Sequence, residues 1–308
     1  MLFAVRTKVL VDAMRFIHFS DIHLEAGFSE VSRKLFLNKR FMGWANLTLR
    51  RRRHYEGSLA KMVALGEFAK TIGADVALCT GDHTALGTEP ELQLARDVLR
   101  PFESLPLGIV TIPGNHDVYV PDAVHVFERL FGDLLESDRP ELAVDGRYPL
   151  VRLFGDHVAV VAVNSTRPNP ALLSSGFIPQ AQLDALRSVL EELRDRFVFV
   201  MTHYAPRLAN GKPDSPRHGL ENADAFLRAT AALPRGAILH GHVHHCFQVR
   251  VPETPIVLSG AGSTTMNARE GLWIYDVEAT PDGPRALATR GRWNGKGWEL
   301  DESTRARL

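Results

Sequence analysis

The segment GIVTIPGNHD occupies residues 108–117 and contains both a predicted strand and a polar cluster. Its first half, Gly108–Ile112, is rich in β-branched residues, which is typical of a short buried strand. Its second half, Gly114-Asn115-His116-Asp117, presents amide, imidazole and carboxylate groups directly after that strand. Gly114 permits a tight turn there because glycine has no Cβ. The segment therefore predicts a buried strand with reactive side chains at its carboxyl end.

Further segments have the composition of buried strands, and several are also followed by polar clusters. The strands are expected at Arg15–Ser20, Asp75–Thr80, His157–Val163, Phe197–Met201, Ala237–His240, Ile256–Ser259 and Leu272–Val277. The clusters are Asp21-Ile22-His23, Gly81-Asp82, Thr202-His203-Tyr204 and Gly241-His242-Val243-His244. Because ligands gather beyond the carboxyl ends of strands in open α/β sheets, we expect all of these clusters to meet at one site.

Helical patterns lie between the predicted strands. Apolar residues recur at helical spacing over Leu59–Gly66 and over Leu183–Leu193. A third helix is expected to begin at the capping residue Asn222 and to turn Phe226 and Ala229 inward. This alternation of strands and helices indicates a layered α/β fold.

No internal repeat or low-complexity linker divides the chain. We therefore predict a single domain over residues 15–308, preceded by an extension over residues 1–14. The region after residue 250 has few helical signals and is expected to form strands and turns.

Composition argues against several classes of protein. The chain of 308 residues has 36 Lys+Arg and 36 Asp+Glu, and this balance argues against specific nucleic-acid binding. A hydrophobic fraction of 45% is enough for a full core and speaks against disorder. The two cysteines, Cys79 and Cys246, favour reduced thiols over a disulfide framework. Without a signal-peptide core or an apolar run of membrane-spanning length, the sequence predicts a cytoplasmic protein.

Seven side chains in the polar clusters are candidate metal ligands, namely Asp21, His23, Asp82, Asn115, His203, His242 and His244. Residues two apart on an extended chain point the same way, so each D-x-H or H-x-H pair presents two ligands to one place. Seven donors exceed what one ion uses beside a substrate, which favours two ions that share a bridging carboxylate. Imidazole, carboxylate and amide donors without thiolate suit two divalent ions such as Mn, Fe or Zn.

In this order, the clusters resemble the motif set of the calcineurin-like metallophosphoesterases, which runs D-x-H, GD, GNH[DE], H and GHxH. The motifs span residues 21 to 244, which is most of the chain. The resemblance implies a four-layer α/β/β/α sandwich with a dimetal site at the edge of its two sheets.

The resemblance also implies a role for each site residue. One ion would be held by Asp21, His23, Asp82 and His244. The other would be held by Asp82, Asn115, His203 and His242, so that Asp82 bridges the pair. His116 would lie over the substrate, and Asp117 would orient it.

Hydrolysis of a phosphoester follows from this arrangement. Two divalent ions neutralise the phosphoryl oxygens and lower the pKa of a shared water, which gives hydroxide at neutral pH. The hydroxide would attack in line with the leaving oxygen, without a covalent enzyme intermediate. His116 would donate a proton to the leaving group or stabilise its charge.

Three further residues are candidates for substrate binding. His83 directly follows Asp82 and either touches substrate or lies on the surface or behind the ligands. His218 lies in a loop between two of the clusters and is a candidate to face the cleft. Arg40 belongs to the basic and apolar segment Arg33–Tyr55.

The segment Arg33–Tyr55 contains the run Arg50–Arg53 and no acidic residue, and Phe41 and Trp44 are among its apolar residues. It either packs its apolar side onto the body of the protein or meets a membrane or substrate with its bases on anionic groups. A peripheral position at the inner face of the membrane therefore stays open beside the cytoplasmic one.

The function that agrees best with these observations is a phosphodiesterase acting on a small phosphodiester or nucleotide, similar to the class III cyclic-nucleotide and glycerophosphodiester enzymes. The stretch from Lys39 to Arg53 resembles that of some UDP-2,3-diacylglucosamine hydrolases, so a pyrophosphohydrolase on a lipid-linked nucleotide is the alternative. A nuclease has little support from the neutral charge. A non-catalytic scaffold of the same fold is disfavoured because every ligand position is filled.

Overall fold

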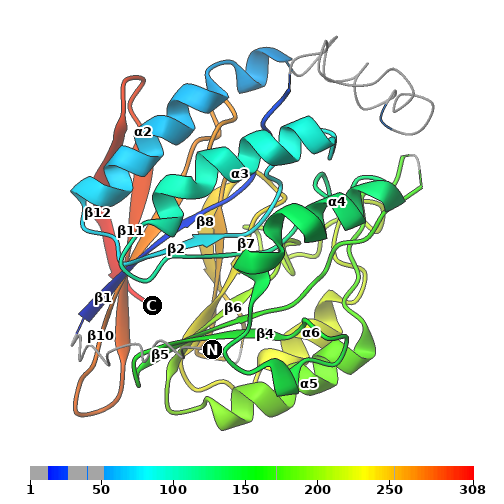
Figure 1. Ribbon diagram of the computed structural model, residues 1–308. Coiled ribbons are helices and arrows are strands. Elements are labelled where there is room, and N and C mark those ends of the chain that lie inside the picture. The colour runs from blue at the N-terminus through cyan, green and yellow to red at the C-terminus, as the bar shows by residue number, and fades with distance from the viewer. Residues whose placement is uncertain (1–12, 27–39, 41–51, 171, 253) are drawn as a thin grey trace, which may run out of the picture.

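The computed structural model describes residues 13–26, 40, 52–170, 172–252 and 254–308. Within them, two six-stranded sheets pack face to face (Figure 1). The first sheet has the order β12-β11-β10-β1-β2-β3. Its strands are β1 (Ala13–Phe19), β2 (Val76–Cys79), β3 (Ile109–Thr111), β10 (Leu272–Glu278), β11 (Arg285–Trp293) and β12 (Trp298–Arg307). Strands β1, β2 and β3 run parallel, while β10, β11 and β12 extend the sheet in antiparallel fashion.

The second sheet has the order β4-β5-β6-β7-β9-β8. Its strands are β4 (Leu150–Phe154), β5 (Val158–Ala162), β6 (Phe197–Met201), β7 (Gly236–His240), β8 (Cys246–Arg250) and β9 (Val257–Ala261). The central strands β5, β6, β7 and β9 are parallel, and β4 and β8 close the two edges antiparallel to their neighbours. Because the central strands are buried on both faces, β5 and β6 are continuous apolar runs.

Helices form the two outer layers. The first sheet is covered by α2 (Ser58–Thr71), α3 (Glu89–Glu103) and α4 (Pro121–Phe131), and the second by α5 (Gln180–Glu192) and α6 (Ala223–Thr230) (Figure 1). Short 3-10 turns occur at η4 (Arg52–Tyr55), η5 (Gly132–Leu135) and η6 (Pro140–Leu142). The α/β/β/α order of layers confirms the predicted fold class.

Two apolar cores hold the layers together. The larger core joins both sheets to α2, α3 and α4, and the smaller one lies between the second sheet and α5 and α6. Aromatic rings connect the sheets: the ring of Phe16 on β1 lies 5.2 Å from that of Phe199 on β6 and 5.6 Å from that of Phe154 on β4. Both Phe16 and Phe199 are fully buried.

The start of α6 differs from the prediction. Asn222 does precede the helix, but its side chain makes no capping hydrogen bond. Its amide exchanges hydrogen bonds with the backbone N–H and C=O of Ile178, at 3.1 and 2.7 Å. Asn222 therefore ties α6 to the segment before α5 instead of capping the helix, while Phe226 and Ala229 are buried as expected.

Several elements were not predicted individually. Helix α3 begins with a capping box, because Thr88 accepts from the N–H of Glu91 and the Glu91 carboxylate accepts from the N–H of Thr88. This T-x-x-E signal is visible in the sequence.

Strand β1 begins at Ala13, two residues before the expected domain start, and Met14 is buried in the core. The first twelve residues lie outside the described part.

Truncating the ring that joins the two sheets should destabilise the fold. We expect Phe16→Ala to lower the free energy of unfolding by about 3–5 kcal/mol, because the surrounding rings collapse only partly into the cavity. Leu172→Ala is the control, since that side chain is 84% exposed, and its effect should stay within about 0.5 kcal/mol. Urea titration followed by circular dichroism measures both. Equal effects would contradict the proposed role of Phe16.

Candidate metal centre

The seven predicted ligands meet at one edge of the two sheets. Each lies in the loop after a strand of the first sheet (β1, β2 or β3) or of the second (β6 or β7). All are buried except His244, whose side chain is 16% exposed. The sandwich thus assembles one polar site from residues that are far apart in the sequence.

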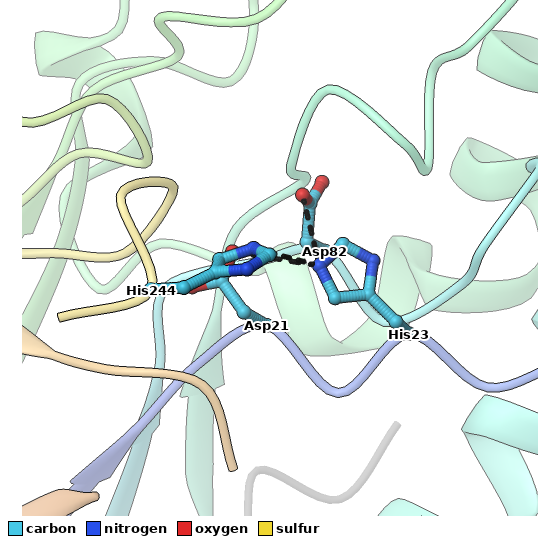
Figure 2. A group of neighbouring side chains, drawn as sticks. All are labelled: Asp21, His23, Asp82 and His244. Carbon is cyan, nitrogen blue, oxygen red and sulfur yellow. Dashed lines mark hydrogen bonds and ion pairs between the residues drawn. The ribbon is translucent and has the colours of Figure 1, made fainter. Parts of the chain in front are cut away.

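Four of these residues form a first group, which Figure 2 shows. The possible ligand atoms of Asp21, His23, Asp82 and His244 all lie within 4.8 Å of one another. Nε2 of His23 is 3.0 Å from Nε2 of His244, which is 3.1 Å from Oδ1 of Asp21. Ligands about 2.0–2.2 Å from one metal ion are separated by roughly 3.0–3.5 Å from each other. The group therefore fits one divalent ion.

The remaining three residues form a second group. Oδ1 of Asn115 lies 3.0 Å from Nε2 of His203 and 2.9 Å from Nδ1 of His242. Asp82 reaches both groups, because its Oδ1 is 3.5 Å from Nε2 of His203 and its Oδ2 is 3.7 Å from Nε2 of His23. This placement of one carboxylate between two groups fits a pair of ions with Asp82 as the bridge.

Contacts with the protein hold the imidazole rings in place. Nδ1 of His203 lies 2.7 Å from the carbonyl of Thr80, and Nε2 of His242 lies 2.8 Å from the carbonyl of His218. Since a carbonyl only accepts, these nitrogens donate, and the opposite ring nitrogen of each histidine presents its lone pair to the site. Nδ1 of His23 has a similar contact with a backbone carbonyl at 3.3 Å.

The backbone is strained at most of the predicted ligands. Five of them have positive φ: Asp21 (55°), His23 (47°), Asp82 (56°), His242 (68°) and His244 (52°). Among the described residues, only two other non-glycine residues do so. Left-handed backbone is unfavourable for side chains with a Cβ and persists where surrounding structure enforces it. Because five of these left-handed residues are predicted ligands, we infer that the backbone adopts this conformation to direct their side chains into the site.

Two glycines allow the close packing of the carboxylates. A Cβ at Gly114 would overlap Oδ1 of Asp82, and a Cβ at Gly241 would overlap Oδ2 of Asp21. The glycines of the GNHD and GHVH motifs are therefore required because another chain segment lies against them.

Electrostatic coupling within the buried site is strong. Burial alone would lower the pKa of His203, but the carboxylate of Asp82 outweighs it and raises that pKa to about 9. Burial would in turn raise the pKa of Asp82, yet His203 and His116 hold it well below its ordinary value. Burial, aided by the charge of His203, lowers the pKa of His242. Such a site exchanges protons for cations, because metal binding requires deprotonated imidazoles.

His116 lies beside the first group, and its ring centre is 4.8 Å from that of His23. Its Nδ1 donates to the carbonyl of Ala85 at 2.6 Å, which fixes the ring with Nδ1 protonated. Its backbone N–H donates to Oδ1 of Asp82 at 2.7 Å. The expectation that Asp117 orients this ring is therefore corrected: the carbonyl of Ala85 does so.

Asp117 instead holds His83, which is fully buried. Its Oδ2 lies 2.8 Å from Nδ1 of His83, whose Nε2 lies 2.8 Å from the hydroxyl of Thr111. Burial would lower the pKa of His83, but the charge of Asp117 outweighs it and raises that pKa well above its ordinary value. The suggestion that His83 touches substrate is wrong, because the pair fastens the loop after β2 to the loop after β3.

Arg40 also has a structural role. It is 1% exposed, and its guanidinium donates to the carbonyls of Leu86 and Gly87 and to Asp122, at 3.1, 2.7 and 2.7 Å. It therefore binds the loop before α3, which corrects its assignment to substrate. The rest of Arg33–Tyr55 up to residue 51 lies outside the described residues, so its interfacial role stays a prediction. Among the described helices, none is long and apolar enough to cross a membrane.

His218 lies against the second group. Its ring centre is 4.1 Å from that of His242, and its Nδ1 is 2.6 Å from Oδ2 of Asp214. Its side chain is 47% exposed. A partly exposed imidazole is therefore held at the rim of the site by a carboxylate.

Sequence reasoning gave no signal for Met266, which lies next to a predicted ligand. Its Sδ is 3.3 Å from Nδ1 of His244. The loop that carries it is anchored by the buried Lys61, whose Nζ donates to Glu270 at 2.6 Å. Because a thioether is a weak acceptor, it holds the His244 ring less strongly than a carbonyl would. Only the fold reveals this neighbour.

This chain matches the model of a known protein family. The family model described as "Calcineurin-like phosphoesterase" matches residues 14–246. A protein of Pseudoalteromonas sp. (strain SM9913), named "probable cyclic nucleotide phosphodiesterase", is 24% identical over 164 residues. These residues make up 53% of this chain and 53% of that protein, so the match spans about half of the relative's length.

Solved structures share the fold at low sequence identity. A dimetal phosphatase from Danio rerio is 13% identical, with a TM-score of 0.63 over 93% of this chain and 98% of that one. A purple acid phosphatase from yellow lupin seeds is 11% identical, with a TM-score of 0.60 over 94% and 53%. GAP50, an anchor in the inner membrane complex of Plasmodium, is 12% identical, with a TM-score of 0.55 over 97% and 89%. The fold alone therefore does not separate an enzyme from an anchor protein.

A methyl group added at Gly114 would overlap the carboxylate of Asp82 and should therefore disturb both groups of candidate metal ligands. We expect Gly114→Ala to lose metal from both positions, because its Cβ displaces the shared carboxylate. Gly297→Ala is the matched control, since a Cβ there meets open space. Elemental analysis after dialysis against Mn²⁺ or Zn²⁺ measures occupancy, and circular dichroism checks folding. A folded Gly114→Ala protein with full occupancy would rule out Asp82 as the bridge.

Proposed function

This chain belongs to the calcineurin-like phosphoesterase family of metal-dependent phosphoester hydrolases, and we propose that it is a phosphodiesterase that cleaves a small phosphodiester or nucleotide. The observation that carries the proposal is the position of Asp82 between two groups of donors from both sheets. A site of this kind suits two divalent ions and an anionic substrate.

The residues would divide between two ions as the family resemblance implies. Asp21, His23, Asp82 and His244 would hold one, and Asp82, Asn115, His203 and His242 the other. When bound, the ions would neutralise the phosphoryl oxygens and supply a nucleophile from water at neutral pH. Imidazole and carboxylate donors suit Mn, Fe and Zn.

His116 would protonate the leaving oxygen through Nε2. The carbonyl of Ala85 holds the opposite nitrogen, and the backbone hydrogen bond to Asp82 ties the proton donor to the bridging carboxylate. Proton donor and metal ligands are therefore positioned by one connected set of contacts, which favours reaction because the groups are already in place.

His218 would contact the substrate at the opposite side of the site. The carboxylate of Asp214 fixes its ring against His242, and its exposure leaves room for a ligand. The partial relative named as a cyclic nucleotide phosphodiesterase makes a cyclic nucleotide the first substrate to test.

Removing the proposed proton donor should affect substrates according to their leaving groups. We expect His116→Gln to lower kcat by about 10²–10⁴-fold on a diester with an alkoxide leaving group. The loss should be much smaller on bis-p-nitrophenyl phosphate, whose leaving group needs little protonation. His125→Gln, with a side chain that is 86% exposed, is the control. Equal losses on both substrates, or loss of metal by elemental analysis, would remove His116 from the role of acid.

A substrate panel tests the reaction class. With Mn²⁺, we expect faster turnover of a cyclic nucleotide or a glycerophosphodiester than of p-nitrophenyl phosphate or UDP-2,3-diacylglucosamine. The activity should vanish in Asp82→Asn, which lacks the shared carboxylate. Preference for the monoester, or for the lipid-linked nucleotide, would overturn the phosphodiesterase proposal, and activity that survives in Asp82→Asn would place the reaction elsewhere.

A further inference from the structure

A cavity of about 280 Å³ lies at the other end of the strands from the metal centre. Its wall includes Phe197 and Gly236, which are the first residues of β6 and β7. Three of the predicted metal ligands, His203, His242 and His244, follow the last residues of the same two strands. Since a five-residue strand is about 16 Å long, the cavity is separate from the metal centre.

The lining of this cavity is strongly basic. It contains four arginines and, among the described residues, one acid, Asp282. The formal charges of these side chains therefore leave an excess of three positive charges. We call this hollow the basic cavity, and its arginines are Arg235, Arg250, Arg285 and Arg307.

The arginines have few acceptors within the protein. Arg285 donates to Asp282 at 2.8 Å, and Arg250 reaches the carbonyl of Pro255 at 3.5 Å. In the described part of the chain, no hydrogen bond or ion pair engages the side chain of Arg235 or Arg307. Like charges around one hollow repel each other, so an anion between them would stabilise the arrangement.

The position of Arg235 is determined by the turn between β10 and β11. A Cβ at Gly283 would overlap its guanidinium, so the backbone of this turn packs directly on the charged group. Gly283 has φ of 101°, which favours glycine. The turn belongs to the first sheet and Arg235 precedes β7 of the second, so an anion bound here would contact both sheets.

The size and chemistry of the hollow indicate the class of ligand. Guanidinium groups bind phosphate through paired N–H donors. The volume lies just below the range of about 300–1,000 Å³ that holds drug-sized ligands. We propose that the basic cavity is a second anion site, which binds a small anion with one or two phosphate groups. This site does not depend on the proposed phosphodiesterase function.

Calorimetric titration of the full chain with pyrophosphate tests the site. An Asp82→Asn background with chelator removes phosphate binding by metal ions. We expect saturable binding to remain in this background and to weaken at least tenfold when Arg235→Gln and Arg307→Gln are added. Arg187→Gln with Arg194→Gln is the matched control, because it removes two exposed arginines of the α5 region. That control should bind like the background.

Inorganic phosphate and AMP are the other probes, and tighter binding of AMP would identify a nucleotide phosphate as the source of the anion. Absent binding in the Asp82→Asn background, or equal binding with and without the two arginines, overturns the proposal.

If the combined variant does not fold, as judged by circular dichroism, Arg307→Gln alone should still weaken binding several-fold, and an unchanged affinity in that variant also overturns the proposal. Metal content and turnover of Arg235→Gln with Arg307→Gln in the native background should be unchanged, which separates this site from the proposed catalytic one.

Discussion

The carboxylate of Asp82 connects the parts of this structure. It reaches His23 of the first sheet and His203 of the second, and it accepts the backbone N–H of His116. A buried carboxylate is stable only if opposite charges and donors surround it. The two sheets must therefore pack so that the loops after β1, β2, β3 and β6 meet, and the glycine that begins the GNHD motif must leave room for the oxygen atoms.

Assembly of this site is unfavourable locally and depends on the rest of the fold. Five predicted ligands have left-handed backbone, and several buried imidazoles lie close together. The cores on either side of the second sheet offset these costs, and the contact between Phe16 and Phe199 joins the two sheets near the middle of β1 and β6. The buried pair of His83 and Asp117 serves the same purpose nearer the site, because it joins two of the ligand loops.

The formal charge of the chain is zero, but two regions at opposite ends of the strands have the chemistry to attract anions. At the carboxyl ends of the strands, acids and histidines form a site whose sign bound cations would reverse. At the amino ends, the four arginines of the basic cavity attract anions directly. A formal charge of zero therefore describes the whole surface and neither of these sites.

The sequence by itself predicted most of the buried strands and the seven candidate donors, because buried strands are largely apolar runs and the donors follow them. It did not resolve β11 and β12, whose polar, half-exposed residues resemble those of loops. Only the tertiary structure showed which histidines and arginines lie at the site and which are buried behind it. His83 and Arg40 proved to be buried supports, and His218 lies at the rim of the site. Contacts of this kind depend on how distant loops pack, which no local pattern of residues encodes.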